Sequence, residues 1–177
     1  MQLETKRLLL REMTAQDLPA LSAILQDEKV MYAYEHAFSD KEVQDWLDKN
    51  LERYRTDGFG LWALVLKETG AMIGQCGITM QQIGEDKKVP EVGYLFRRDV
   101  WHQGYATEAA MACRDYAFAQ LQFPHVFSII RDNNIPSQKV ARRNGMTQWG
   151  SMVKHYCGID MPHILFRITR EDWEQLP

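Results

Sequence analysis

The feature of this sequence that most limits its fold is a change of hydrophobic period at Phe59. From Leu18 to Tyr54, apolar residues recur mainly every three or four positions, which is the spacing of one helix face. From Phe59 to Phe96 the chain carries three apolar, β-rich stretches, separated by turn residues at 68–70 and 84–88 as antiparallel strands are. The helical period returns after Arg98. This order predicts a mixed α/β layered fold.

Capping and turn signals set the bounds of the other elements. Ser39 and Glu42 form a capping box, so a helix is expected over about 40–55. Gly145 is expected to end a later helix as its C′ residue. No repeat, low-complexity tract or linker divides the chain, which predicts a single domain over residues 1–177. The expected order is a strand at 7–12, helices from about Thr14 and Asp40, strands at 59–67, 71–80 and 90–96, a helix after Arg98, a strand at 125–130, a helix at 136–144, and strands at 146–154 and 163–169.

The charge balance bears on which partners the protein has. The 177 residues include 21 Lys and Arg against 24 Asp and Glu, and no block of basic residues. Nucleic-acid binding needs a concentrated positive patch, so we expect no nucleic-acid partner. No run of about 18 apolar residues could span a membrane, and residues 1–11 offer no signal peptide. We expect a cytoplasmic protein without a membrane partner, either a monomer or a homodimer.

Cysteine and histidine patterns predict no metal site. Cys76, Cys113 and Cys157 are far apart and form no C-x-x-C, so we expect reduced, half-buried core residues. The five histidines form no H-E-x-x-H pattern. The sequence also lacks the G-x-S-x-G, G-x-x-x-x-G-K-[ST] and G-x-G-x-x-G patterns, which weakens hydrolase, nucleotide triphosphatase and dinucleotide-binding interpretations.

The segment from Gln103 to Thr107 is a candidate phosphate cradle. It lies between an expected strand end near Phe96 and the start of a helix, with Gly104 at the mouth of that helix. Glycine lets the backbone approach an anion closely, and the first helical turn presents unpaired N–H groups to it. The alternative is a tight loop that leads into a buried helix.

Two segments differ in charge. Residues 131–145 contain four basic residues and one acidic residue, whereas residues 27–57 contain five basic and nine acidic residues. This asymmetry favours a phosphate-bearing donor near the first segment and a cationic acceptor near the second. The alternative for any single charge is a solvated helix face.

Two segments of the chain carry motifs of a known family. Glu91 to Ala110 and Asn133 to Met146 resemble the acetyl-CoA-binding motifs of the GCN5-related N-acetyltransferase (GNAT) superfamily, in particular its ribosomal-protein N-terminal acetyltransferase-like (RimJ/RimL-type) branch. The signature, Gln or Arg, two residues, Gly, one residue, then Gly or Ala, stands here as Trp101 to Ala106, with Trp in its first position. The "GYATEA" of the branch is intact from Gly104.

Further segments extend the resemblance over nearly the whole chain. The Asn-x-x-Ser motif is Asn134 to Ser137, and it is followed by Arg-Asn-Gly-Met where the family usually has Lys-Leu-Gly-Phe. The opening "LETKRLLLRE" and the closing "LFRITREDW" are also similar to the branch. The resemblance implies a mixed, mostly antiparallel twisted sheet of about six or seven strands, flanked by helices, with a splayed central strand pair.

The resemblance also implies a binding site for acetyl-CoA as co-substrate, without a metal. The strand ending near Phe96 would bond the pantetheine arm and polarise the thioester carbonyl, with a main-chain N–H near Leu95 or Phe96 as the oxyanion donor. The loop at the helix start would hold the pyrophosphate, and the Asn-x-x-Ser motif would bind the pantetheine arm and lie near the sulfur. The implied cofactor-binding residues are Tyr94, Leu95, Phe96, Arg97, His102, Gln103, Gly104, Tyr105, Ala106, Thr107, Asn134 and Ser137.

The chemistry of the reaction suggests three catalytic residues. An α-amino group has a pKa of about 8 and lysine about 10.4, so a proton acceptor must make the amine neutral. Glu91 is the first choice, with a solvated strand-edge residue as the alternative. Ser137 and Tyr156 are candidate donors to the leaving thiolate, with a plain core aromatic as the alternative for Tyr156. No covalent enzyme intermediate is needed, so Cys113 and Cys157 are not expected to act as nucleophiles.

The sequence therefore predicts an acetyl-CoA-dependent N-acetyltransferase acting on a primary amine, either a protein N-terminus or a small molecule such as a polyamine or amino sugar. A non-catalytic acyl-CoA-binding module and a nucleotide-phosphate binder are the alternatives. Some of the aromatic residues between Tyr32 and Trp62, with Glu35, His36 and Asp40, would form the wall of the acceptor site. No motif identifies the amine.

Overall fold

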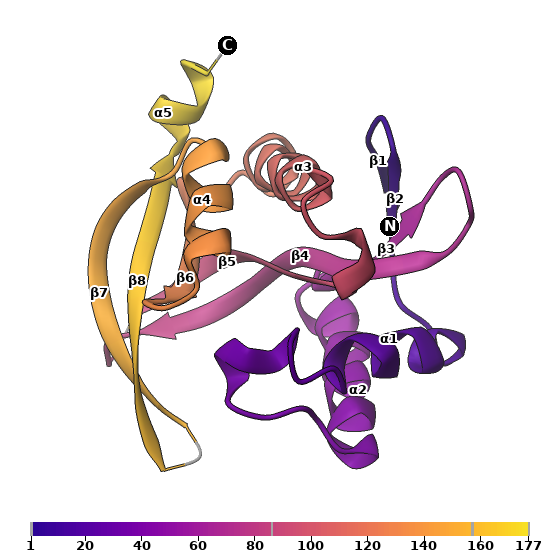
Figure 1. Ribbon diagram of the computed structural model, residues 1–177. Helices are drawn as coiled ribbons and strands as arrows, with labels where there is room; N and C mark the ends of the chain where they lie inside the picture. The colour runs from indigo at the N-terminus through magenta and orange to yellow at the C-terminus, as the bar shows by residue number, and fades with distance from the viewer. Residues whose placement is uncertain (1, 86, 157, 177) are drawn as a thin grey trace.

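The computed structural model describes residues 2–85, 87–156 and 158–176 of the chain. Within them lies an eight-stranded sheet in the order β1-β2-β3-β4-β5-β6-β8-β7 (Figure 1). Neighbouring strands are antiparallel except β5 and β6, which are parallel. The strands are β1 (Gln2–Glu4), β2 (Leu8–Arg11), β3 (Leu61–Leu66), β4 (Met72–Ile83), β5 (Lys87–Phe96), β6 (His125–Arg131), β7 (Thr147–Tyr156) and β8 (Ile159–Thr169).

Helices cover both faces of this sheet (Figure 1). On one face, α1 and α2 form a core with Leu61 and Ala63 of β3. On the other face, α3 and α4 form a core with Cys76, Ile78 and Phe96 of β4 and β5. The helices are α1 (Leu18–Leu25), α2 (Asp40–Thr56), α3 (Tyr105–Ala119), α4 (Ile135–Arg143) and α5 (Arg170–Glu174), with 3₁₀ turns at Ala15–Asp17, Met31–Tyr34 and Arg98–Val100.

The expected mixed α/β class and the mostly antiparallel sheet flanked by helices are confirmed, but the sheet has eight strands instead of six or seven. The additional strand is β1, which pairs with β2 through Leu3 and Leu10. Its three residues include none that is fully buried, so no hydrophobic alternation marks it in the sequence. The sequence also does not predict α5, which begins with a capping box at Thr169 and Asp172.

The predicted helix ends are confirmed. The Ser39 N–H donates to Glu42 Oε2 at 2.8 Å and the Glu42 N–H donates to Ser39 Oγ at 3.3 Å, which is the expected capping box of α2. Gly145 follows Asn144, the C-cap of α4, with φ +79°, a left-handed conformation that favours glycine. Local capping interactions thus fix the start of α2 and the end of α4.

The two described cysteines lie in the core between β4 and α3. Cys76 and Cys113 are fully buried and reduced, with 3.4 Å between their sulfurs, so the expectation of half-buried residues is wrong for both. The cause is close packing, because α3 presents Ala109, Ala110 and Ala117 to the sheet at zero exposure. Cys157 lies outside the described residues. No helix in the described ranges is long and apolar enough to cross a membrane.

The pair β5 and β6 separates almost at once. Their pairing consists of Glu91 with Phe127, after which the two strands diverge. We call the opening between residues 92–96 of β5 and 128–131 of β6 the seam. The splayed central pair that the resemblance implies is therefore present, and it is the only parallel contact of the sheet in the part of the chain that the structure describes.

Candidate active site

The backbone of β5 offers hydrogen-bonding groups to the seam. The Arg97 N–H donates to the Ile73 carbonyl of β4 at 2.8 Å. Because backbone groups alternate in direction along a strand, the N–H and carbonyl of Leu95 also point toward β4. The N–H and carbonyl groups of Tyr94 and Phe96 point into the seam. Of the two expected oxyanion donors, Phe96 is the one whose N–H has the required direction.

Two side chains close the narrow end of the seam. In a continued parallel ladder the Ile129 N–H would donate to the Val92 carbonyl. Instead it donates to Oε1 of Glu91 at 3.1 Å, and the Ser128 hydroxyl donates to the Val92 carbonyl at 2.9 Å. The backbone groups where the ladder stops are therefore satisfied, which makes the seam a stable feature of the fold.

Glu91 is a carboxyl group in a protected position. Burial raises the pKa of Glu91 above its ordinary value, against the opposing effects of Lys154, the Ile129 N–H and Arg53. A carboxylate whose pKa is raised is a stronger proton acceptor once ionised, which is what amine deprotonation needs. The solvated strand-edge alternative for Glu91 does not describe this environment.

A cleft of about 990 Å³ lies along the seam and is lined by residues on both faces of the sheet. Its lining on the α3 and α4 side includes Gly104 and Asn134, and its lining on the α2 side includes Trp46 and Gln75. The sequence-predicted residues that line it are Glu91, Tyr94, Leu95, Phe96, His102, Gly104, Tyr105, Ala106, Thr107, Asn134, Ser137 and Tyr156. Arg97 and Gln103 are not among the lining residues.

The start of α3 has the geometry of an anion cradle. Gly104 is its N-cap, with φ +82°, and it leaves the amides of the first turn without side-chain caps. A Cβ at this position would meet Nη2 of Arg7 at 3.4 Å. The first turn of a long helix suits a pyrophosphate.

The turn before β2 braces this cradle. Glu108, in the first turn of α3, accepts hydrogen bonds from the Thr5 hydroxyl at 2.6 Å and from the Arg7 N–H at 2.8 Å. Nε of Arg7 donates to the same carboxylate at 2.7 Å, and Nη1 donates to the Gln103 carbonyl at 2.9 Å. The side chain of Arg7 therefore fixes the cradle loop from outside the cleft.

The tryptophan that departs from the family signature has a structural role. Nε1 of Trp101 donates to the Phe96 carbonyl at 3.1 Å. This carbonyl points into the seam, so the indole occupies the last acceptor of β5 and ties the cradle loop to the strand end. The remaining seam groups of β5 are the carbonyl of Tyr94 and the N–H groups of Tyr94 and Phe96.

The Asn-x-x-Ser motif forms the start of α4 and reaches across the cleft. Oδ1 of Asn134 accepts from the Ser137 N–H at 3.2 Å and from the Tyr32 hydroxyl at 2.7 Å. The Tyr94 hydroxyl donates to the Ser137 carbonyl at 3.1 Å. Burial raises the pKa of Tyr94, so this phenol remains a donor. The motif thus links β5, α4 and the turn that contains Tyr32.

The α2 side of the cleft carries a charge opposite in sign to the net charge of residues 27–57. The face of α2 that lines the cleft carries Trp46, Lys49 and Arg53, spaced three and four residues apart. The acidic residues of α2 lie on its other faces, and among the described lining residues Glu91 is the only acidic one. The net negative charge of residues 27–57 is therefore not on the face that lines the cleft, because net charge along a helix does not tell which face carries it. The expectation of a cationic acceptor near this segment stays a prediction.

Tyr156 lies at the mouth of the cleft. It is 38% exposed, and its ring stacks on His36 with centroids 6.2 Å apart. Nε2 of His36 is 2.9 Å from Oε1 of Glu42. These contacts join the end of β7 to the segment between α1 and α2, so Tyr156 is not a core aromatic.

The sequence analysis missed several polar residues of the cleft. Arg53, Gln75, Lys154 and His163 all line it. Nδ1 of His163 bonds the Met161 carbonyl at 2.8 Å, and burial lowers the pKa of His163, so its ring stays neutral near pH 7. The only local signal was the spacing of Arg53 from Trp46. Within the described ranges, no cluster of three or more His, Cys, Asp or Glu side chains could hold a metal ion.

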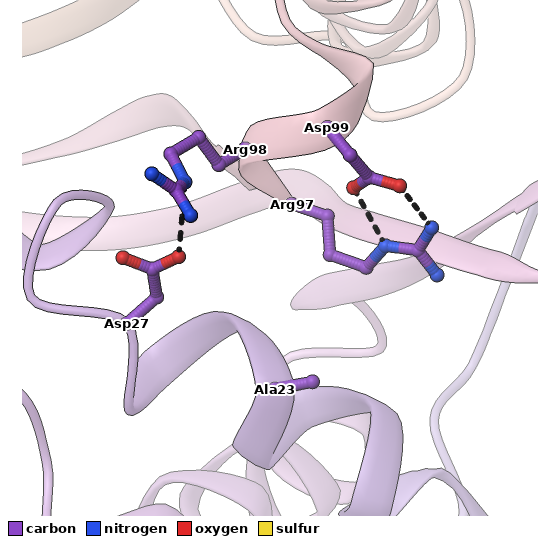
Figure 2. A pocket seen from close by; sticks show the side chains of 5 residues that line it. All are labelled: Ala23, Asp27, Arg97, Arg98 and Asp99. Carbon is purple, nitrogen blue, oxygen red and sulfur yellow. Dashed lines mark hydrogen bonds and ion pairs between the residues drawn. The ribbon is translucent and has the colours of Figure 1, made fainter.

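A second, smaller hollow of about 440 Å³ lies beside the cradle loop (Figure 2). Arg97 binds both oxygens of Asp99 there, at 2.9 and 2.5 Å, and Arg98 lies 3.5 Å from Asp27. Figure 2 shows these side chains directed at one another above Ala23. The Arg97 side chain therefore points away from the main cleft, and its charge is already paired.

Comparisons with known proteins agree with this geometry. A family model described as an acetyltransferase (GNAT) domain matches residues 7–147. Over 145 residues the chain is 39% identical to the uncharacterized protein YkkB of Bacillus subtilis (strain 168). The matched region covers 81% of this chain and 84% of that protein.

Solved structures show the same fold. An acetyltransferase of the GNAT family from Bacillus anthracis is similar with a TM-score of 0.83 and 22% identity, over 97% of this chain and 99% of that one. RimL, a ribosomal L7/L12 alpha-N-protein acetyltransferase in complex with coenzyme A, is similar with a TM-score of 0.77 and 18% identity, over 96% of this chain and 98% of that one.

Proposed function

The chain belongs to the GNAT acetyltransferase family, and from this premise we propose that it transfers the acetyl group of acetyl-CoA to a primary amine by direct attack. The amine is either a protein N-terminal α-amine or a small-molecule amine. The family membership carries the acetyl-CoA-dependent transfer itself. The acceptor class and the roles of individual residues are parts of the proposal.

The observation that carries the proposal is the seam, with a helix N-terminus on one side and a buried carboxyl group at its closed end. The α3 and α4 side fits acetyl-CoA, because the Gly104 cradle suits a pyrophosphate and the Tyr94 backbone suits an amide-bearing arm. Acetyl-CoA supplies an acyl group activated as a thioester. Lys139 and Arg143 of α4 line the same part of the cleft and add positive charge for the phosphates.

Glu91 is the proposed general base. An amine attacks only in its neutral form, and Glu91 takes its proton directly or through one water. The raised pKa of Glu91 brings this group closer to the pKa of the amine than an exposed carboxylate would be. Glu91 keeps one carboxylate oxygen for this task, because the Ile129 N–H bonds the other.

The N–H of Phe96 stabilises the negative charge that develops on the carbonyl oxygen, since it points into the seam. As the new N–C bond forms and the C–S bond breaks, the sulfur leaves as a thiolate. Ser137 and Tyr156 are the proposed donors of the proton that converts this thiolate to free CoA. The products are the acetylated amine and CoA, and no residue of the chain is modified.

Calorimetric titration with acetyl-CoA, CoA and ADP in parallel tests the cofactor part of this proposal. We expect acetyl-CoA to bind much more tightly than ADP, because the seam recognises the pantetheine arm as well as the phosphates. Equal binding of ADP would leave only a nucleotide-phosphate site.

Thiol release with a panel of amines then tests catalysis. Amine-dependent release of free CoA supports transfer, whereas tight acetyl-CoA binding without release by any amine would indicate a non-catalytic acyl-CoA-binding module.

A further inference from the structure

We take the α2 side of the cleft as the side where the amine acceptor binds, and call it the acceptor side. It carries more positive charge than the deprotonation of an amine requires. Lys49 and Arg53 of α2 and Lys154 of β7 line it, and Glu91 is the single carboxylate among the described lining residues. Outside the lining, Asp57 lies near Arg53. In the part of the chain that the structure describes, the ion pairs of carboxylates involve none of these three cations. A surplus of cations around a substrate site indicates an anionic substrate.

Arg53 is the cation whose environment most needs an anion. Its side chain is partly buried, and burial lowers the pKa of Arg53. Nη1 donates to Oδ1 of Asn50 at 3.2 Å, which uses one of the five N–H donors of the guanidinium. Both Arg53 and Lys154 lower the pKa of Glu91, so both lie close to the carboxyl group that would receive the amine proton.

Gln75 gives a second, independent indication of a ligand on the same wall. It is fully buried, and its Oε1 accepts from Nε1 of Trp46 at 3.0 Å. An indole N–H can only donate, so this bond fixes the amide and turns Nε2 away from Trp46. Nε2 of Gln75 is buried without a hydrogen-bond partner in the described residues, and Gln75 lines the cleft. A buried donor left unpaired is costly, so this one is suited to an oxygen of a bound molecule.

We propose that the acceptor is an amine that also bears a carboxylate, as a free amino acid does. Arg53 pairs with this carboxylate beside Glu91, and Nε2 of Gln75 donates to an oxygen of the remaining part of the molecule. Lys154 and Lys49 add to the attraction. This inference rests on the proposed transfer reaction and names its substrate class. It disfavours polyamines, which the same cations repel.

The first test compares amino acids with their carboxamides as acceptors, using thiol release by the 177-residue protein near neutral pH. A carboxamide has the less basic amine, so chemistry alone favours it. We expect kcat/KM to be at least about tenfold higher for the amino acid than for its amide, since a charged hydrogen bond is lost. Turnover of the amides at equal or higher kcat/KM would overturn the inference.

The second test changes Arg53. Arg53→Gln is expected to raise KM for the amino acid by about tenfold or more and to change KM for the amide by less than about twofold. Arg53→Lys should restore part of the difference, because it keeps the charge without the fork of donors. Arg55→Gln is the matched control, since Arg55 lies on the same helix, pairs with Glu52 at 2.5 Å and does not line the cleft. An equal rise in KM for the amino acid and for its amide would contradict the assignment.

Two further arms complete the design. Peptides with Asp or Asn in the second position distinguish the carboxylate of a protein N-terminal segment from that of a free amino acid, and an advantage of either acid form supports the inference. If acetyl-CoA binds but no amine releases thiol, the proposed reaction fails. If amines react without any preference for a carboxylate, the reaction stands and only this inference fails.

Discussion

A single carboxyl group has two tasks at the end of the seam. Glu91 binds the Ile129 N–H where the ladder stops, and it lines the cleft where an amine would arrive. Burial raises the pKa of Glu91, and Lys154 and Arg53 limit this rise. The Ile129 N–H, which holds the side chain in place, also lowers the pKa of Glu91 against the larger effect of burial.

The first prediction concerns the pH dependence of Glu91→Gln. Because the pKa of Glu91 is raised, kcat/KM of the natural protein should fall as the pH drops through a value above 4.5. The variant should lack this inflection, should follow the fraction of neutral amine instead, and should be slower by about 10²-fold or more near neutral pH. The deficit should shrink toward high pH, where most of the amine is already neutral. Glu85→Gln, in the exposed turn of the same hairpin, is the control, and an unchanged profile in Glu91→Gln would remove Glu91 from this role.

The second prediction concerns the cradle glycine. Gly104→Val places a branched side chain at φ +82°, where an anion would approach the first turn of α3. Acetyl-CoA affinity should fall by at least about tenfold in calorimetry, because a close approach to the amides is lost. Gly70→Val has a similar φ of +70° in open space at the β3–β4 turn, so it should show a comparable loss of stability with unchanged affinity. Equal affinities for both variants would contradict the cradle.

Two residues of the cleft, Gly104 and Gln75, differ in how far the sequence could predict their place. Gly104 was predictable, because a glycine before a returning helical period has a local meaning. Gln75 was not, since a glutamine inside an apolar strand becomes informative only when Trp46, distant in sequence, fixes its amide. Tertiary contacts carry that information.

At the scale of elements, the start of α3 depends on a turn nearly a hundred residues earlier in the chain. Glu108 joins Thr5 and Arg7 to the helix, and Arg7 holds the cradle loop through the Gln103 carbonyl. This turn therefore supports the proposed cofactor site, which it does not line. Removal of this turn should therefore weaken the proposed cofactor site, because the bond from Arg7 to the Gln103 carbonyl is lost.

The third prediction tests this support. Glu108→Gln removes the charge that pairs with Arg7, whose side chain is partly exposed. We expect acetyl-CoA affinity to fall by several-fold and the free energy of unfolding to fall by about 1–2 kcal/mol, measured by calorimetry and urea unfolding. Glu4→Gln breaks the neighbouring exposed pair with Lys67 and should change neither quantity measurably. A normal affinity in Glu108→Gln would show that the loop holds its shape alone.

Helix α2 shows what local patterns can and cannot predict about an element. Its start at Ser39 was correct, because the capping box is a local interaction. Its functional charge was not predictable from composition, because Lys49 and Arg53 share one face while most acidic residues occupy the others. The rotation of a helix about its axis is set by packing against the sheet.

At the scale of the whole molecule, the seam divides the sheet into a part formed by β1 to β5 and a part formed by β6 to β8. The two parts share one residue pair in the sheet, together with the helices packed across them. Local hydrophobic patterns identified nearly every strand but do not specify which strands are neighbours. The splayed pair was expected only from the family resemblance.

The fourth prediction follows from this division. A ligand that fills the seam contacts both parts, so acetyl-CoA should stabilise the whole fold. At about 100 times Kd it adds about 2.7 kcal/mol to the free energy of unfolding, which for a chain of this size raises Tm by about 5–10 °C. ADP at the same concentration should give a much smaller shift in thermal unfolding. A similar rise with ADP would mean that the seam contributes nothing.

The alternating direction of the β5 backbone has a consequence for hydrogen exchange. The amide protons of Gly93, Leu95 and Arg97 face β4, so they should exchange slowly with deuterated solvent. Those of Tyr94 and Phe96 face the seam and should exchange quickly in the ligand-free protein. On addition of acetyl-CoA these two should become protected while their neighbours hardly change. One strand would then report, residue by residue, whether its open edge is filled.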